Sequence, residues 1–224
     1  MADGPYSLSV YNSTVHVLKV IKGLSSERED VKRRFYECKP DAVALSISKE
    51  ELAGLRALIE GSEHSVALSP YEEVYARRLA AFGEVRVPPP AYEEAMLLAI
   101  QQGIPTHAID MDEEAYTSAF CSHISGLALF WHSLCFRRIK KKRFKAHSPE
   151  EFVEMWDRYI NRLKGFRNLE RAREEHMAKE LIKFSGHYNS ILAVIEWERG
   201  KGVMEHVQQL KDRNLPIHNE LGKV

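Results

Sequence analysis

The chain lacks an excess of charge of either sign. Its 224 residues include 32 Lys plus Arg and 32 Asp plus Glu, so the formal net charge at pH 7 is zero. Nucleic-acid binding of a general kind is driven by cations that neutralise phosphates, and a neutral chain is a poor match to that class of protein. Nucleic acid is therefore not expected as a partner of the whole chain, although a local basic patch remains compatible with this balance.

Cysteine is also scarce. The three cysteines are Cys38, Cys121 and Cys135, none of them in a C-x-x-C pair, and their odd number fits no disulfide framework. They lie in apolar or helical surroundings, so we expect buried thiols in a reducing compartment.

Long apolar runs are missing too. Residues 1–13 show no basic stretch followed by an apolar one, so no signal peptide is predicted. No segment reaches the ~18 uncharged apolar residues of a spanning helix. The nearest, residues 119–136, is interrupted by Ser and His. We therefore expect a cytoplasmic protein.

What the chain does contain is an alternation of apolar strands and amphipathic helices. Residues 191–195, I-L-A-V-I, form a short continuous apolar run that is typical of a parallel strand covered on both faces. Residues 42–47 and 106–109 predict two more strands. Residues 6–12 predict the first strand, with His16 just past it or on its last turn. Helices between the strands imply parallel pairing through crossover connections.

Helix starts are signalled by serines with a Glu three residues later, at Ser26, Ser48 and Ser69. From residue 113 to 184 only helical periodicity is found. The sequence thus predicts one α/β domain over residues 1–224, with a mostly parallel sheet flanked by helices on both sides. A helical insertion at residues 113–184 precedes the last strand, and residues 208–224 are expected to be a polar tail.

Polar groups follow four of the predicted strands. The carboxyl ends of parallel strands meet at one edge of a sheet, so these groups can converge there. His16, Asp110 and Glu196 could bind a divalent metal such as Zn²⁺, Co²⁺ or Mn²⁺, which would activate a water with a carboxylate as general base. No H-E-x-x-H motif supports this site. The alternative is that no metal binds and these residues belong to ordinary loops and caps.

A basic cluster follows an apolar stretch at residues 127–131. Such a pairing can dock on an anionic membrane surface. It can also hold phosphates, with Trp131 or Phe144 as a stacking surface, or be a solvated turn. The cluster holds seven cations: Arg137, Arg138, Lys140, Lys141, Lys142, Arg143 and Lys145.

Arg173 and Met177 lie four residues apart on one helix face. If that face is packed, Arg173 points inward and needs a carboxylate partner, for which Glu196 and Glu198 are the candidates. Otherwise this is a surface helix with local ion pairs.

Six segments resemble, in order, motifs of the TraB/PrgY family, whose relatives include the metal-dependent Tiki peptidases. S-T-V-H at 13–16 is similar to the family's G-T-x-H, and K-P-D-A-V-A-L at 39–45 to its K/R-P-D-V-V-A-V-E. Residues 90–105 resemble E-x-x-x-A…G-I-P, and the I-D pair at 109–110 resembles I-D-R. R-E-E-H-M-A at 173–178 is similar to R-D-E-Y-M-A, and residues 193–203 align with A-V-V-G-A-G-H-V-x-G-I. His16, Glu94, Asp110 and Arg173 are the matching positions that we carry over.

The departures from the family pattern imply a degenerate site. Ser46 replaces a strand-end glutamate, and Glu196 and Glu198 replace two glycines. Arg199 stands where the family has a histidine, and a guanidinium that stays protonated cannot ligate a metal.

Three hypotheses follow for function. The leading one is a catalytically degenerate TraB-like domain that binds or regulates, with a protein or peptide as its unidentified partner. The second is a peptidase-like, divalent-metal-dependent hydrolase with a rearranged site, so the sequence leaves open whether the chain is an enzyme. The third is a peripheral membrane or partner-binding module that uses residues 137–145, and self-association is also left open. The expected pocket comprises His16, Glu94, Asp110, Arg173, Glu196, Glu198 and Arg199.

Overall fold

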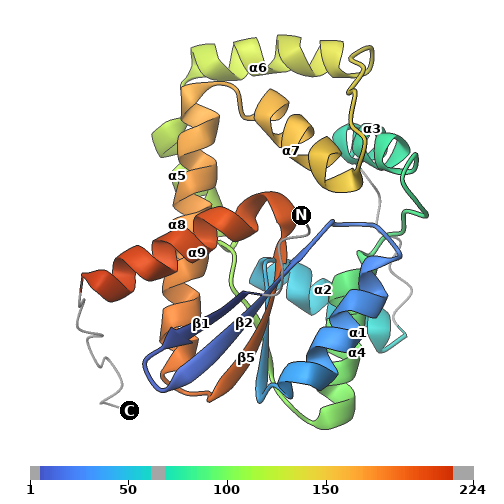
Figure 1. The fold of residues 1–224 in the computed structure, drawn as a ribbon. Helices are drawn as coiled ribbons and strands as arrows, with labels where there is room; N and C mark the ends of the chain where they lie inside the picture. The colour runs from blue at the N-terminus through green and yellow to red at the C-terminus, as the bar shows by residue number, and fades with distance from the viewer. Residues whose placement is uncertain (1–5, 62–68, 214–224) are drawn as a thin grey trace.

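The computed structural model describes residues 6–61 and 69–213 (Figure 1). Its centre is a five-stranded sheet with the order β1-β2-β5-β3-β4. β1 pairs antiparallel with β2, and the other neighbouring strands are parallel. The strands are β1 (Tyr6–Val10), β2 (Ser13–Val20), β3 (Ala42–Leu45), β4 (Thr106–Ala108) and β5 (Ser190–Glu196).

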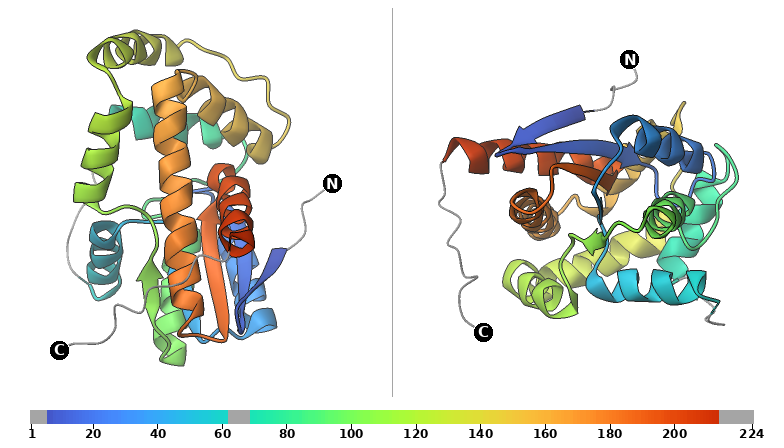
Figure 2. Two further views of the ribbon diagram at one scale, coloured as in Figure 1. Left: turned by 90° about the vertical axis from the view of Figure 1, so that its left-hand side faces the viewer. Right: turned by 90° about the horizontal axis from the view of Figure 1, so that it is seen from below.

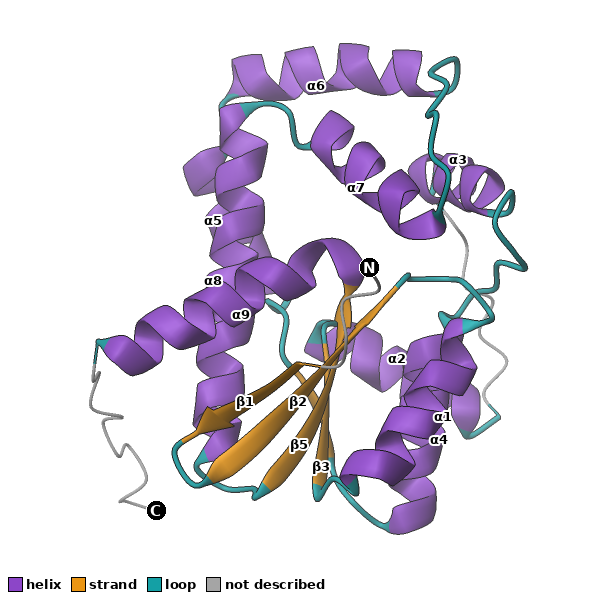
Figure 3. Ribbon diagram, viewed as in Figure 1, coloured by secondary structure: helices purple, strands orange, loops and turns teal. Residues whose placement is uncertain are grey.

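Helices cover both faces of the sheet and extend beyond its carboxyl edge (Figure 3). This arrangement confirms the predicted α/β class, the mostly parallel sheet and the helical insertion before the last strand. The helices of the described residues are α1 (Glu27–Cys38), α2 (Lys49–Ile59), α3 (Pro70–Leu79), α4 (Pro90–Gln102), α5 (Glu113–His123), α6 (Gly126–Ile139), α7 (Pro149–Ile160), α8 (Lys164–Ser185) and α9 (Trp197–Asp212).

The central strand β5 is apolar because helices cover both of its faces. Leu192 and Val194 pack on the face that α1, α2 and α4 cover, whereas Ile191, Ala193 and Ile195 face α8 and α9. Because successive side chains of a strand point to opposite faces, a strand covered on both sides has no position for a polar residue.

Serine caps set the starts of several helices. Ser48 and Ser69 form complete capping boxes with Glu51 and Glu72, as the sequence predicts. The same prediction is wrong for Ser26, whose backbone is already helical and whose side chain makes no cap. A cap needs an extended backbone so that the side-chain oxygen can reach back to the first turn.

The insertion places α5 to α8 between β4 and β5, and α8 returns the chain to the sheet (Figure 2). Helices α3, α6 and α7 form a layer beyond the carboxyl edge. A third apolar cluster joins this layer to the segment after β2; its buried members are Ile21, Leu24, Leu79, Ile139, Phe152, Val153 and Trp156.

Two predicted boundaries are wrong. The expected first strand is a hairpin, in which Tyr11 (φ 53°) and Asn12 form the turn and Val10 pairs with Ser13. Apolar and polar residues continue to alternate across this short turn, which contains no glycine. The sequence pattern therefore predicts a single strand that ends near His16. The expected polar tail at 208–224 begins inside α9, which extends to Asp212; residues 214–224 lie outside the described residues.

No single helix in the described part of the chain is long and apolar enough to cross a bilayer. Helices α5 and α6 meet the criteria of length and composition only as a pair, and the two are bent by 102°.

Candidate functional site

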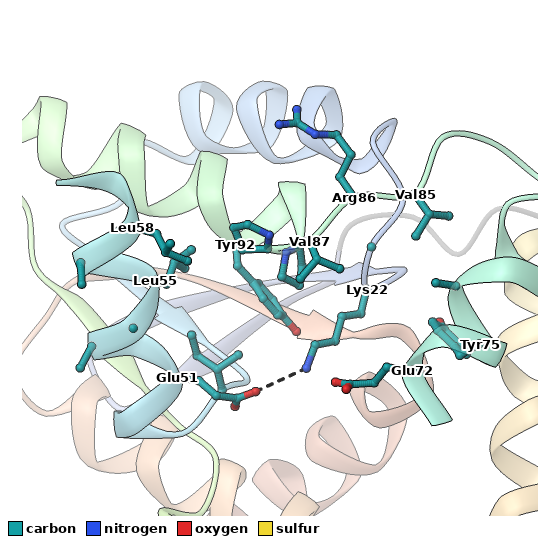
Figure 4. Close-up of a pocket in the computed structure, with 18 residues that line it drawn as sticks. Lys22, Glu51, Leu55, Leu58, Glu72, Tyr75, Val85, Arg86, Val87 and Tyr92 are labelled. Atoms are coloured by element: carbon teal, nitrogen blue, oxygen red, sulfur yellow. Dashed lines mark ion pairs between the residues drawn. The ribbon is translucent and has the colours of Figure 1, made fainter. Parts of the chain in front are cut away.

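A cavity of about 550 Å³ opens at the carboxyl edge of the sheet (Figure 4). It lies between α2, α3 and the segment 85–89 that leads into α4. Most of its wall is apolar, and its polar side chains gather at Lys22, Glu51 and Glu72. The main wall residues are Leu55, Leu58, Tyr75, Val85, Val87 and Tyr92.

Lys22 is the central cation of this cavity. Its Nζ lies 3.3 Å from a carboxylate oxygen of Glu196 and 3.7 Å from one of Glu51. Burial alone lowers the pKa of Lys22, but the two carboxylates outweigh it and raise that pKa above its ordinary value. The ammonium therefore stays charged and ties the end of β5 to the cavity.

Beneath the cavity, Ser46 connects three elements. Its hydroxyl lies 2.8 Å from the hydroxyl of Tyr92 and accepts a hydrogen bond of 3.1 Å from the backbone N–H of Glu196. Burial raises the pKa of Tyr92 well above its ordinary value, so the phenol stays protonated. Ser46, expected only as the place of a lost glutamate, thus fixes the start of α9 against β3 and α4.

Beside the cavity, two arginines share one carboxylate. Arg173 donates to Asp110 and, at 2.8 Å, to Glu170. Arg199 lies 3.4 Å from Glu170 and 3.1 Å from Glu174, and also pairs with Asp157. Glu196 and Glu198 were the predicted partners of Arg173. Arg173 instead forms its ion pairs with Asp110 and Glu170. The reason is the register of α8, which places Arg173 beside the end of β4.

The guanidinium of Arg199 is only 5% exposed. Burial lowers the pKa of Arg199 to about 10, so it remains protonated at neutral pH. Asp157, Glu170 and Glu174 together supply its counter-charge. Arg199 is therefore the centre of an ion-pair network.

Two glycines allow α9 to approach its neighbours closely. A Cβ on Gly202 would lie 2.2 Å from the Glu174 carboxylate, and one on Gly200 would lie 2.5 Å from the Lys19 side chain. Both glycines lie inside α9, which starts at Trp197. Tertiary packing outweighs the low helix propensity of glycine here.

His16 lies away from this edge. It sits in the middle of β2 opposite Leu192, 2.9 Å from the Ser7 hydroxyl and 3.2 Å from Arg34. Burial and the Arg34 charge lower the pKa of His16. Glu196 lies four residues farther along β5, roughly 13 Å away at ~3.3 Å per residue. The predicted metal site of His16, Asp110 and Glu196 is therefore wrong.

The other side chains that could ligate a divalent metal do not form a site for it either. Within residues 6–61 and 69–213, no three His, Cys, Asp or Glu side chains gather closely enough to hold one. Asp110 pairs with Arg173, and Glu196 pairs with Lys22. Cations of the chain itself thus neutralise the carboxylates that were expected to be ligands.

Two further candidates lie outside the cavity. Glu94 on α4 pairs with Arg28 of α1, 3.5 Å away. Glu198 lines a second cavity of about 530 Å³ together with Asp157 and Trp197. The expected seven-residue pocket is therefore split into separate environments.

Sequence reasoning missed Lys22, Tyr92 and Glu170. Lys22 comes two residues after β2 ends at Val20, so recognising the hairpin would have placed it at the edge. Tyr92 looks like any helix residue until the fold places it beneath the cavity.

The Glu198 carboxyl predicts how the stability of the fold depends on pH. Burial and the neighbouring Glu196 raise the pKa of Glu198 from 4.5 to about 8. The folded state then binds a proton more tightly than the unfolded state, so the free energy of unfolding falls as pH rises through this range. Between pH 6.5 and 8.5, we expect this carboxyl to lower the free energy of unfolding by about 1 kcal/mol, or 2–4 °C in Tm, after discounting for solvent screening.

Thermal melts of the wild type and of Glu198→Gln across this range test the prediction. The amide carries no proton that titrates, so the variant should show a flatter profile. An equal slope in both proteins would contradict it.

In comparisons with known proteins, no family model and no curated protein match this chain. The TraB/PrgY resemblance therefore stays a prediction from the sequence.

Proposed function

We propose that this chain is a TraB-like α/β domain that binds a small, mainly apolar ligand in the cavity at the carboxyl edge of its sheet, without hydrolysing it. The observation that carries the proposal is the cavity itself. In open α/β folds, ligands bind outside the carboxyl ends of the strands, and this cavity adjoins the ends of β2 and β3.

The size and lining of the cavity support a small-molecule ligand. At about 550 Å³ it falls in the range of sites that enclose such ligands. Its apolar wall suits the body of the ligand, and Lys22 and Glu51 offer one donor and one acceptor for a single polar group. A ligand with an apolar body and one polar end fits this pattern.

The surrounding ion pairs support binding over hydrolysis. A general base needs a carboxylate that is free to take a proton from water or substrate. Glu196 is held by Lys22, and Asp110 by Arg173. Arg199, at the position of the family's histidine, serves the ion-pair network. This agrees with the degenerate site that the resemblance implies.

Titration with the neutral apolar fluorophore N-phenyl-1-naphthylamine tests the proposal. We expect saturable binding at one site. Gly54 lines the cavity on α2, and a Cβ there would meet nothing within 4 Å. Gly54→Phe should therefore fill the cavity, improve helix propensity and weaken binding by about 10-fold or more.

Arg56→Phe is the matched control, since it adds the same side chain to the exposed part of α2 outside the cavity lining. It should bind the fluorophore like the wild type. Absence of saturable binding, or an equal loss in both variants, would refute the cavity as the site.

A further inference from the structure

Helix α6 lies at the end of the molecule farthest from the sheet (Figure 1). One of its faces is an exposed apolar stripe. Leu127, Phe130 and Trp131 are 68%, 58% and 53% exposed, and the half-buried Leu134 continues the same side of the helix. These spacings of three and four residues define one face, here called the outer stripe. Cys135 and Ile139, on another face of α6, are buried against the protein. The outer stripe therefore contributes nothing to the core.

Charge is strongly segregated around this stripe. Residues 115–149 contain no Asp or Glu, in a chain with 32 acidic residues. All seven cations of the basic segment, residues 137–145, are exposed. The outer stripe thus runs directly into a surface of one sign.

The basic segment is fixed in place by its contacts with the helical layer, and the ammonium of Lys142 lies over the Tyr159 ring, 5.2 Å from its centre. The ring of Phe144 packs 5.5 Å from Trp156 and 5.7 Å from Phe152, between ring centres. The backbone carbonyl of Lys140 accepts a hydrogen bond of 3.0 Å from Arg78 on α3. Apolar stripe and cations are therefore presented together by a packed layer of helices.

We infer that this chain docks on anionic lipid bilayers through the outer stripe of α6 and the basic segment that follows it. Helix α6 lies in the plane of the interface with Leu127, Phe130, Trp131 and Leu134 among the acyl chains. The cations of the basic segment contact lipid phosphates. This surface lies apart from the cavity at the carboxyl edge, and the inference does not depend on a ligand there.

Charge complementarity favours lipid over the other occupants. In a symmetric contact between two copies, the same surface meets itself, so the basic segments would repel each other. A nucleic acid would match the cations and could stack on Trp131, but the aliphatic Leu127 and Leu134 would find no partner. A bilayer matches both parts of the surface.

Co-sedimentation of the full chain with phosphatidylcholine vesicles, with and without phosphatidylglycerol, tests the inference. We expect binding to the anionic vesicles that weakens with salt. Replacing Lys140, Lys141 and Lys142 by Gln should lower the partition coefficient about 100-fold. The exposed pair Phe130→Ser and Trp131→Ser should lower it about 10-fold or more without loss of folding.

The matched control is Lys32→Gln, Lys49→Gln and Lys201→Gln, which removes the same charge from exposed positions elsewhere. It should bind within about 3-fold of the wild type. Bromolipids should quench Trp131, and Trp131→Phe should abolish that part of the quenching.

Several outcomes would overturn the inference. One is failure to bind anionic vesicles, and another is an equal loss in the control. Binding to single-stranded oligonucleotides in place of vesicles, or a dimer that Trp131→Ser dissociates, would assign the surface to another occupant. Gly54→Phe, which tests the cavity, should leave vesicle binding unchanged, so the two proposals fail separately.

Discussion

Replacing Arg199 by Met is expected to lower the free energy of unfolding by about 3–5 kcal/mol, because it removes one partner from a buried ion-pair network. Glu170 and Glu174 are each 15% exposed, and both lose the guanidinium that they face. Urea denaturation at neutral pH measures the effect. Arg158→Met, an exposed arginine on α7, is the control and should change stability by less than about 0.5 kcal/mol.

The loss caused by Arg199→Met should shrink at low pH. Burial and the adjacent Glu170 raise the pKa of Glu174 to about 7 even in the wild type, so its carboxyl accepts a proton readily. Once Glu170 and Glu174 are neutral, less uncompensated charge remains buried. A loss below about 1 kcal/mol would show that the network is dispensable. A loss that is identical at pH 5 and pH 8 would show that the carboxylates left without a partner do not cause it.

Trp156→Ala should lower the free energy of unfolding by about 3–5 kcal/mol, because it leaves a cavity in the aromatic cluster of the helical layer. The Trp156 ring is 3% exposed. Its centre lies 5.4 Å from those of Tyr71 and Tyr75 and 5.5 Å from that of Phe144. Trp156→Phe keeps an aromatic ring but loses the hydrogen bond of 2.6 Å to the Tyr71 hydroxyl. We therefore expect it to lower the free energy of unfolding by about 1–2 kcal/mol.

The Trp156→Ala variant also tests whether the layer of α3, α6 and α7 folds together with the sheet. The third apolar cluster includes Ile21 from the segment after β2, so the layer and the sheet share buried contacts. Denaturation followed by circular dichroism and by tryptophan fluorescence should give one coincident transition, moved to lower urea in Trp156→Ala. Two separate transitions would show an independent helical unit.

The sequence supports the fold where one physical cause dominates. Residues 191–195 are apolar because β5 is covered on both faces, and Ser48 and Ser69 carry local capping signals. These features depend on neighbours in the chain or on burial alone. The Tyr11–Asn12 turn carries no comparable signal, so the hairpin was missed and His16 was placed at the wrong end of its strand.

The site could be predicted only by region. The carboxyl edge of the sheet was the expected place, and Glu196 and Asp110 do lie there, each paired with a cation of the chain. The pairings themselves depend on how α8 and α9 are rotated against the sheet. Arg173 therefore contacts Asp110 and Glu170, and Lys22 takes Glu196, which no spacing in the sequence reveals.

The order of strands has a consequence for synthesis of the protein. β5 is the last strand to leave the ribosome, yet it lies between β2 and β3 and pairs with both. Until it arrives, the facing edges of β2 and β3 have no partner, and unpaired strand edges are templates for aggregation. Pairing of the sheet's centre must therefore wait until β5 has been translated, and rapid completion or a chaperone would protect those edges in the nascent chain.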